Sequence, residues 1–252
     1  MNTVSKKAHI GKNVTIGEYT VIKDDVVIGD NVEIASNVIV DNGARISSNV
    51  KLHHGAVIST IPQDLKFKGE ITTLEIGEGT IVREYATLNR GTSANNKTVV
   101  GKYCLIMAYA HVAHDCILGD NVILANSVNL GGHVQIGDWA IIGGISGVHQ
   151  FTRIGKQTIV STHSKVVKDI PPYITAGNLP LKYEGLNLIG LRRRGFTNKQ
   201  INRIDYAYNI IYKSGLNVST AIAKLKKEKN LTEEIKEIIN FIDSSERGII
   251  LD

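Results

Sequence analysis

Branched aliphatic residues recur at every sixth position along most of the first two thirds of the chain. One run has nine such positions beginning at Ile10, a second has three beginning at Ile76, and a third has twelve from Val100 to Val166. An α-helix repeats about every 3.6 residues and a half-buried strand about every two, so neither element explains a period of six. A second register of small or β-branched residues lies two positions before each aliphatic residue. The pattern predicts a parallel β-helix built from hexapeptide repeats.

Three hexapeptides would form one coil of 18 residues, so the 24 repeats predict about eight coils stacked along one axis. Residues 18 apart in an unbroken run should then lie directly above one another. Glycine often follows the aliphatic residue, as at Gly101 and Gly119, where we expect a backbone conformation that side chains resist. The chain has 24 Gly but only four Phe and one Trp, which suits a narrow interior.

Two segments interrupt the six-residue rhythm, at 61–70 and 91–97. The first is polar and begins with proline, and the second is rich in Gly, Ser and Asn. Insertions in solenoid proteins collect on the surface where ligands bind. We therefore expect the first segment to contribute binding residues, whereas the second has little chemistry of its own.

The rhythm ends after Val166, and Pro171-Pro172 cannot continue a strand ladder because proline lacks a backbone N–H. Helical periodicity then takes over, beyond a stretch that contains three consecutive arginines. We predict three parts, namely a β-helix domain at residues 1–170, a linker at 171–196 and a helical domain at 197–252.

The helical domain carries clear start and stop signals. Thr197 and Gln200 read as a capping box for a helix that stops near Gly215. Two further helices fit residues 218–229 and 232–243. Such a block would cover the open edge that every stack of strands leaves at its end.

Cysteine usage and charge indicate the compartment and the class of partner. Cys104 and Cys116 fall on the inward register twelve residues apart, so we expect two buried free thiols in a reducing compartment. The chain has neither an apolar leader nor a stretch of about 20 apolar residues, which predicts a cytoplasmic protein without stable membrane insertion. The formal charge of +5 suits an anionic substrate or an acidic protein partner, and we expect no binding to nucleic acid.

Candidate chemistry concentrates in one column of residues. His111 and His114 flank the inward-facing Val112, so both side chains can lie on the outer surface. One coil above His114 lies Gly132, and two coils above lies Gln150. The column predicts a cleft with a base, room for an acyl group and an exposed Gly132 N–H that could stabilise an oxyanion.

His133 and His149 rim this column, so four of the eight histidines cluster on three adjacent coils. A single surface histidine in a solenoid is usually only solvated, and the clustering argues against that interpretation here. A metal site completed by Asp115 is an alternative, but no zinc-type spacing is evident, and we expect no metal. A covalent cysteine mechanism is disfavoured because both thiols should point inward.

Six motifs carry a resemblance to a known family. The chain closely resembles the UDP-N-acetylglucosamine 3-O-acyltransferases that start lipid A biosynthesis, from the first coil to the C-terminal helices. The matching motifs are Gln-Asp-Leu-Lys at 63–66, Asn-Arg-Gly-Thr at 89–92, His-Val-Ala-His-Asp-Cys at 111–116, Val-His-Gln-Phe at 148–151, Pro-Pro-Tyr at 171–173 and Arg-Arg-Gly-Phe at 193–196.

The resemblance implies a left-handed β-helix that assembles as a homotrimer with active sites between subunits. It implies transfer of an (R)-3-hydroxyacyl group from acyl carrier protein to the 3-hydroxyl of UDP-N-acetylglucosamine. The phosphopantetheine of the carrier protein would bear the thioester, and no separate cofactor or covalent intermediate would be needed.

By resemblance, His114 would be the general base, Asp115 would orient its imidazole, and the Gly132 amide would bind the oxyanion. Asp64 would hold the sugar hydroxyls. The other substrate-binding residues would be Gln63, Lys66, His111, His133 and Gln150 for sugar, phosphate or acyl groups, and His149, Asn187, Arg193 and Arg194 for the nucleotide.

Three positions depart from the family pattern. Asn89 replaces a histidine of many relatives, and Ile189 replaces an acidic residue of some, which puts one polar contact and one nucleotide contact in doubt. Thr162 replaces a glycine near the floor of the acyl pocket. If Thr162 is the chain-length ruler, its bulk predicts a preference for ten- and twelve-carbon donors over those of fourteen or more, since each methylene is worth only about 1–3 kcal/mol.

The acidic carrier protein needs a basic docking face, which Lys165, Lys168 and Arg153 could supply. The same base and cleft could serve a 3-amino UDP-sugar, so the acceptor group stays open at this stage. A coenzyme A-dependent hexapeptide acetyltransferase would share the fold, but the loop at 63–66 and the helical block argue against it.

Two more alternatives fit less well. The later N-acyltransferase of the same pathway usually has an extra N-terminal uridine-binding domain, whereas the coils here begin by Ala8. A catalytically silent β-helix, such as an ice-binding or scaffold protein, would show flat threonine arrays and no histidine cluster.

Overall fold

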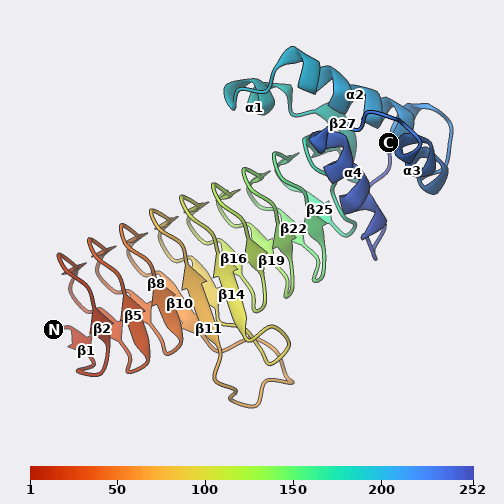
Figure 1. Ribbon diagram of the computed structural model, residues 1–252. Helices are drawn as coiled ribbons and strands as arrows, with labels where there is room; N and C mark the ends of the chain where they lie inside the picture. The colour runs from red at the N-terminus through yellow and green to blue at the C-terminus, as the bar shows by residue number, and fades with distance from the viewer.

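Short parallel strands stack into three sheets, and from β1 to β25 the chain visits the sheets in strict rotation (Figure 1). The computed structural model describes residues 1–252. Sheet A contains β1 (Thr3–Val4), β4 (Val21–Ile22), β7 (Ile39–Val40), β10 (Val57–Thr60), β13 (Thr87–Asn89), β16 (His111–Val112), β19 (Asn129–Leu130), β22 (Gly147–Val148) and β25 (Lys165–Val166). Sheet B contains β2 (His9–Ile10), β5 (Val26–Ile28), β8 (Ala44–Ile46), β11 (Thr73–Ile76), β14 (Lys97–Val100), β17 (Ile117–Leu118), β20 (Gln135–Ile136) and β23 (Arg153–Ile154). Sheet C contains β3 (Thr15–Ile16), β6 (Glu33–Ile34), β9 (Lys51–Leu52), β12 (Ile81–Val82), β15 (Leu105–Ile106), β18 (Ile123–Leu124), β21 (Ile141–Ile142), β24 (Ile159–Val160), β26 (Ile174–Gly177) and β27 (Lys182–Leu186).

The pairing register follows the predicted coil length. Val21 pairs with Ile39, 18 residues later, in the first coils. The offset grows only where an insertion intervenes, so that Val57 pairs with Thr87 and Thr87 with His111. All strand pairs are parallel except β26 with β27. The fold is a left-handed parallel β-helix followed by C-terminal helices, as the resemblance implied.

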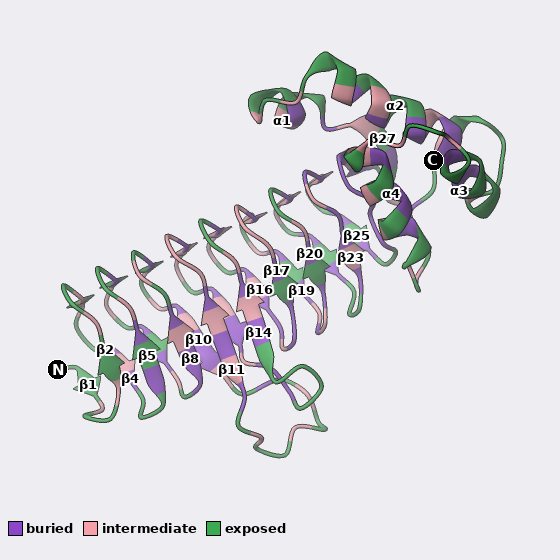
Figure 2. Cartoon of the chain, in the orientation of Figure 1, coloured by how far each residue is buried: buried purple, intermediate pink, exposed green.

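The aliphatic repeat forms the core. Each of the strands β2–β25 contains one repeat residue, and from Ile22 to Val166 every one of these side chains is at most 4 % exposed. Ile10 in the first coil is 39 % exposed, because no coil covers it from below. Figure 2 shows buried residues recurring from coil to coil along the prism.

Close packing between coils explains the glycines that follow the aliphatic residues. A Cβ atom on Gly101 would collide with the backbone carbonyl of Gly119 in the next coil, yet the φ angle of Gly101 is not positive. The expectation of an unusual backbone conformation at these glycines was therefore wrong. Left-handed residues lie two positions further on instead, as at Asn121 (φ 58°) and Asp115 (φ 59°). Asn, which tolerates this region better than most residues, is common at these positions, but Tyr103 and Trp139 adopt the same conformation.

Both insertions leave the prism at the same corner. We call the set of turns that leads from each sheet A strand to the next sheet B strand the A–B corner. The first insertion lies between β10 and β11 and the second between β13 and β14, and both project from the prism in Figure 1. The turn at 113–116, which contains His114, lies at the A–B corner of the following coil, between β16 and β17.

Residues 171–196, expected to be a linker, contain regular structure. Pro171 and Pro172 lie in the turn before β26, and β26 pairs in parallel with β24, so the sheet C ladder resumes after the prolines. Strand β27 folds back on β26, and helix α1 (Leu188–Arg193) follows. The prolines do not end the sheet because they fall outside a strand. The three domain boundaries themselves stay a prediction.

Three longer helices cover the C-terminal end of the prism, namely α2 (Asn198–Lys213), α3 (Val218–Lys226) and α4 (Glu233–Asp243). The predicted capping box of Thr197 and Gln200 is formed at the start of α2. The Tyr208 hydroxyl on α2 donates a 2.6 Å hydrogen bond to the carbonyl of Pro172, which ties the helices to the last coil. None of the helices has the length and apolar character needed to cross a bilayer.

Candidate active site

The A–B corner places His114 against the carboxylate of Asp115. The His114 Nδ1 atom lies 2.8 Å from Asp115 Oδ2. An ionised carboxylate only accepts hydrogen bonds, so Nδ1 carries the proton and Nε2 is left with a free lone pair. The His114 side chain is 12 % exposed and the Asp115 side chain is fully buried. The pair is therefore an imidazole at the surface of the prism, oriented from below the surface by a fixed anion.

Asp115 is held by the second insertion as well as by His114. The backbone N–H of Thr92 donates to Oδ1 at 3.0 Å, and the Thr92 hydroxyl donates to Oδ2 at 2.7 Å. Burial raises the pKa of Asp115, but hydrogen bonds from Thr92 and His114 outweigh this effect and hold the pKa below its usual range. We expected little chemistry from this insertion, and the missed signal was the threonine of the Asn-Arg-Gly-Thr motif.

His133 lies beside this pair rather than in the groove described below. Its Nε2 atom is 3.6 Å from Asp115 Oδ2, and its ring meets the His114 ring edge-on with centroids 5.2 Å apart. Phe151 stacks on the other face of His133 at a centroid distance of 4.4 Å. Burial lowers the pKa of His133, and the Asp115 carboxylate offsets only part of that shift, so the ring is neutral at pH 7.

Gly132 lies directly above the imidazole, as the 18-residue register predicted. A Cβ atom at this position would come within 2.5 Å of His114 Cε1 and 2.7 Å of its Nε2. Any side chain there would displace the ring or cover its free nitrogen. The space above Nε2 exists because residue 132 is a glycine.

A groove of ≈ 540 Å³ opens in front of His114. It brings together residues from the first insertion and from four successive coils. Its lining includes Gln63, His111, His114, Gly132, His149 and Gln150.

Asp64 and Lys66, also in the first insertion, do not line the groove. Asp64 Oδ1 accepts a 2.9 Å hydrogen bond from the Lys66 backbone N–H, which shapes the loop. The negative charge of Asp64 raises the pKa of His133, as the smallest of the influences on that ring. His111 is held by a 2.7 Å hydrogen bond between its Nδ1 and the Thr87 hydroxyl, and burial lowers the pKa of His111, with a smaller contribution from His114.

Several predicted residues lie away from this groove within one chain. Thr162 is exposed in the turn between β24 and β25, at the corner that joins sheet C to sheet A. Asn187 is 2 % exposed and caps α1, with its Oδ1 accepting from Gly190 N–H and its Nδ2 donating to the Gln157 carbonyl.

The two predicted arginines are at the end of α1. Arg193 is exposed in the last turn of the helix, and the Arg194 guanidinium lies 4.8 Å from the ring centroid of Trp139. Neither side chain lines the groove of His114. The structure thus divides the predicted site residues between the A–B corner and other parts of the surface.

The departures at Asn89 and Ile189 have different structural settings. Asn89 is buried, and its Nδ2 donates to the Thr60 hydroxyl at 2.9 Å and the Ile61 carbonyl at 3.0 Å. The residue anchors the start of the first insertion and does not line the groove. Ile189 is 67 % exposed on α1.

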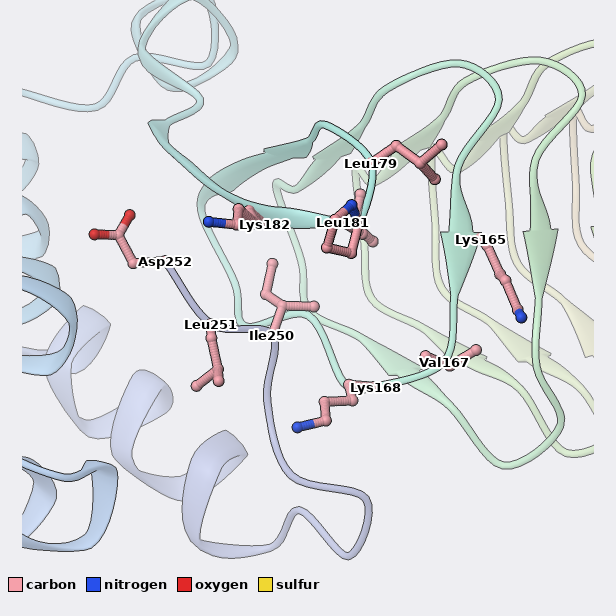
Figure 3. A pocket seen from close by; sticks show the side chains of 10 residues that line it. Lys165, Val167, Lys168, Leu179, Leu181, Lys182, Ile250, Leu251 and Asp252 are labelled. Atoms are coloured by element: carbon pink, nitrogen blue, oxygen red, sulfur yellow. The ribbon is translucent and has the colours of Figure 1, made fainter.

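An apolar pocket of ≈ 480 Å³ adjoins the groove, because Lys165 and Val167 line both. Figure 3 shows its wall, in which Leu179, Leu181 and Ile250 surround the cavity and three lysines lie at its edge. The lysines are Lys165, Lys168 and Lys182. Arg153, expected at a docking face with them, is instead bonded to Ser244 and stacked on Phe241 of α4.

The side chains at the A–B corner include three possible metal ligands. Ligand atoms of His114, Asp115 and His133 all lie within 4.8 Å of one another, a spacing that a divalent cation could use. Both carboxylate oxygens of Asp115, however, already accept hydrogen bonds.

Cys104 and Cys116 are free and buried, as predicted, and burial raises their thiol pKa values to about 11 and about 12. Neither thiol forms a nucleophilic thiolate at neutral pH.

Known sequences match the chain over nearly its full length. Residues 169–250 match a family described as "Udp N-acetylglucosamine O-acyltransferase; Domain 2", and residues 7–42 and 97–132 match the bacterial transferase hexapeptide family. A curated protein from Herminiimonas arsenicoxydans, named acyl-(acyl-carrier-protein)–UDP-N-acetylglucosamine O-acyltransferase, is 46 % identical over 98 % of this chain and 96 % of its own length. Its namesake from Thiobacillus denitrificans is 44 % identical over 75 % of this chain and 74 % of its own length.

Solved structures agree with the sequence matches. A UDP-N-acetylglucosamine acyltransferase from Bacteroides fragilis superposes with a TM-score of 0.96 at 47 % identity, over 99 % of this chain and 98 % of that one. A Francisella novicida UDP-N-acetylglucosamine acyltransferase gives a TM-score of 0.97 at 36 % identity, over 100 % of this chain and 92 % of that one. The similarity covers the prism, both insertions and the C-terminal helices together.

Proposed function

The chain belongs to the UDP-N-acetylglucosamine O-acyltransferase family, and from this premise we propose how it moves an acyl group from acyl carrier protein to UDP-N-acetylglucosamine in lipid A biosynthesis. The group would be an (R)-3-hydroxyacyl chain and the acceptor the 3-hydroxyl of the glucosamine. The observation that carries the mechanism is the His114–Asp115 pair, which presents a free imidazole nitrogen to the space that Gly132 leaves open.

His114 Nε2 takes the proton from the sugar 3-hydroxyl as that oxygen attacks the thioester carbonyl carbon. Asp115 stabilises the imidazolium that forms, because its carboxylate is already hydrogen-bonded to Nδ1. The tetrahedral intermediate then expels the pantetheine thiolate, which receives the proton from His114. The acyl group passes directly to the sugar, and no cofactor other than the donor's own phosphopantetheine takes part.

The Gly132 N–H would bind the oxyanion. At the same hexapeptide position in other coils the backbone N–H donates to a side chain of the coil above, as Lys102 does to Asp120 at 2.7 Å and Asp120 to Asp138 at 2.8 Å. Gln150 occupies that place above Gly132 and accepts no such bond, and the Gly132 N–H has no acceptor within the chain. A fixed N–H without an acceptor beside the base is suited to a developing negative charge.

The sites would lie between subunits of a homotrimer. Thr162, Arg193 and Arg194 are predicted to contact substrate but do not line the groove of their own His114. We propose that the arginines of one subunit meet the diphosphate of the nucleotide bound at a neighbour's groove, where fixed guanidinium groups suit phosphate oxygens. His149, Gln150, Asp64 and Lys66 would complete the sugar and nucleotide contacts.

The apolar pocket and its three lysines would receive the donor. Its position beside the groove suits the phosphopantetheine arm of the donor, which must carry the thioester to His114. The three lysines suit an acidic carrier protein. Charge reversal at Lys165 and Lys168 should raise the KM for acyl carrier protein more than the KM for the sugar nucleotide, since Lys168 lines only the pocket and Lys165 lines both the pocket and the groove. An unchanged KM for the carrier protein would remove this docking face.

The test of the function is a purified-protein assay of UDP-N-acetylglucosamine with 3-hydroxyacyl carrier proteins of several chain lengths. We expect robust transfer that His114→Ala abolishes and that His9→Ala, which removes an exposed histidine of the first coil, leaves intact. A preference for ten- and twelve-carbon donors would support Thr162 as the ruler. Transfer that is indifferent to His114 would contradict the mechanism.

The same assay separates the remaining alternatives. An acceptor with a 3-amine in place of the 3-hydroxyl, or coenzyme A thioesters in place of the carrier protein, should be poorer substrates. Asn89, one of the departures from the family pattern, gives no support to the amine, because its side chain is hydrogen-bonded to Thr60 and Ile61. We further propose that the reaction takes place in the cytoplasm, where free thiols such as Cys104 persist.

A further inference from the structure

Thr92 contacts the proposed catalytic pair through both of its hydrogen-bond donors. Its backbone N–H reaches Asp115 Oδ1 at 3.0 Å, and its hydroxyl reaches Asp115 Oδ2 at 2.7 Å. Thr92 is 6 % exposed, and the Asp115 side chain is fully buried, so water cannot readily replace either donor. One residue of the second insertion therefore binds both oxygens of the carboxylate that orients His114.

The second insertion is built to hold Thr92 in place. Gly91 lies so close to the backbone of Lys97 that no side chain fits between them. The Thr72 hydroxyl donates to the Gly91 carbonyl at 2.6 Å, and the Asn96 N–H donates to the Thr92 carbonyl at 2.7 Å. Contacts of the preceding residue Gly91 and of the Thr92 carbonyl thus hold Thr92 in place.

The two bonds fix the plane of the carboxylate. A carboxylate rotates easily about its Cβ–Cγ bond, and the hydrogen bond to His114 restrains only one of its oxygens. Thr92 restrains both, so Oδ2 stays in line with His114 Nδ1. If Oδ2 turned away, the imidazole could carry its proton on Nε2 and would then have no free nitrogen toward the acceptor.

We propose that Thr92 is a positioning residue for the acyl transfer, fixing Asp115 so that His114 keeps its proton on Nδ1 and presents an unprotonated Nε2. The inference rests on the proposed function, since it acts through the same base. It also assigns a purpose to the Asn-Arg-Gly-Thr motif at 89–92, in which Asn89 anchors the first insertion and Thr92 anchors the catalytic pair.

Thr92→Val tests the proposal because it keeps the shape of the side chain and removes the hydroxyl. We expect kcat to fall about tenfold to a hundredfold, as for a displaced catalytic group, while the KM for UDP-N-acetylglucosamine changes less than about twofold. Thr92→Ser restores the hydroxyl and should recover most of the rate. Thr80→Val is the matched control, since Thr80 is also buried and its hydroxyl donates to the Gly101 carbonyl at 2.8 Å at a different corner.

A double-variant cycle distinguishes positioning from general support of the fold. In an Asp115→Asn background, adding Thr92→Val should cost less than about twofold in kcat, because the partner through which Thr92 acts has already been altered. Nitrogen NMR of the His114 ring should show the Nδ1–H form in the parent and in Thr92→Ser, and a mixture of tautomers in Thr92→Val. If Thr92→Val unfolds, Thr92→Ala takes its place as the variant without the hydroxyl, and its kcat and tautomers are compared with those of Thr92→Ser.

The outcomes separate this inference from the proposed function. A parent enzyme that transfers no acyl group would contradict the proposed function, while the NMR comparison would still test the contact. An active parent that loses its activity with His114→Ala but keeps it with Thr92→Val would overturn the role of Thr92 alone. The same loss of rate in the parent and in the Asp115→Asn background would also overturn it.

Discussion

At the scale of single residues, Gly132 controls the space in which the reaction would occur. The added methyl group of Gly132→Ala would lie within 2.5 Å of the His114 ring, so the imidazole must move. We expect kcat to fall about a hundredfold, because displacing a catalytic group by an ångström can cost that much. Steady-state kinetics together with thermal unfolding by circular dichroism would check this. Wild-type kcat in a correctly folded variant would contradict the arrangement.

Two half-buried histidines, His111 and His133, predict how stability depends on pH. Burial lowers the pKa of His111 and of His133 from the usual 6.5, so the unfolded chain binds their protons first as the pH falls. The folded state therefore has its full stability from these two neutral rings above pH 6.5. That stability is lost as the pH falls from 6.5 through the lowered pKa values of the folded state. Urea unfolding at pH 7.5 and pH 5.5 should show this loss. His111→Gln should reduce the difference, whereas replacing the exposed His163 should not.

Sequence reasoning located the base and its neighbours but not the residue that orients them. The 18-residue register placed Gly132 above His114 without any structural information, because a solenoid converts sequence distance directly into height. It could not place Thr92, because the second insertion adds residues that belong to no repeat, and the path of such a loop depends on contacts like that of Thr72 with Gly91.

At the scale of elements, the spacing between coils sets the choice of glycine. Gly101→Ala would press its methyl group against the Gly119 carbonyl of the next coil, where neither backbone can yield. We expect the free energy of unfolding to fall by about 1–3 kcal/mol, as for overpacked cores. Gly147→Ala is the control, because a Cβ atom there would have no neighbour within 4 Å. Urea unfolding of both variants would check the difference, and equal effects would contradict the packing argument.

The strands and helices were largely predictable because each repeats a local rule. Every hexapeptide has its inward aliphatic residue, and α2 begins at the predicted capping box of Thr197 with Gln200. Strands β26 and β27 were missed because they follow a proline pair and pair with an offset outside the 18-residue register. Such pairing depends on the last coil and the helices around it, which a periodic pattern does not describe.

At the scale of the whole molecule, the division of the predicted site residues tests the proposed assembly. Subunits with His114→Ala and subunits with Arg193→Ala plus Arg194→Ala should each form inactive homotrimers. Co-expressed and purified as mixed trimers, they should recover about a quarter of the parent activity. In random assembly, about a quarter of the interfaces pair a subunit that keeps His114 with a neighbour that keeps both arginines. Activity that stays absent in verified mixed trimers would place the whole site within one chain.

The coil register also has a consequence for how the chain folds. Ladder partners are separated by 18 residues in most coils and by 24 or 30 around the insertions, although the chain has 252 residues. Each coil can therefore close a short loop on the coil already formed, and no step requires the two ends of the chain to meet. Folding can start at any well-packed pair of coils and spread in both directions, as in other one-dimensional proteins. The long prism is thus assembled by many similar local events rather than by one global search.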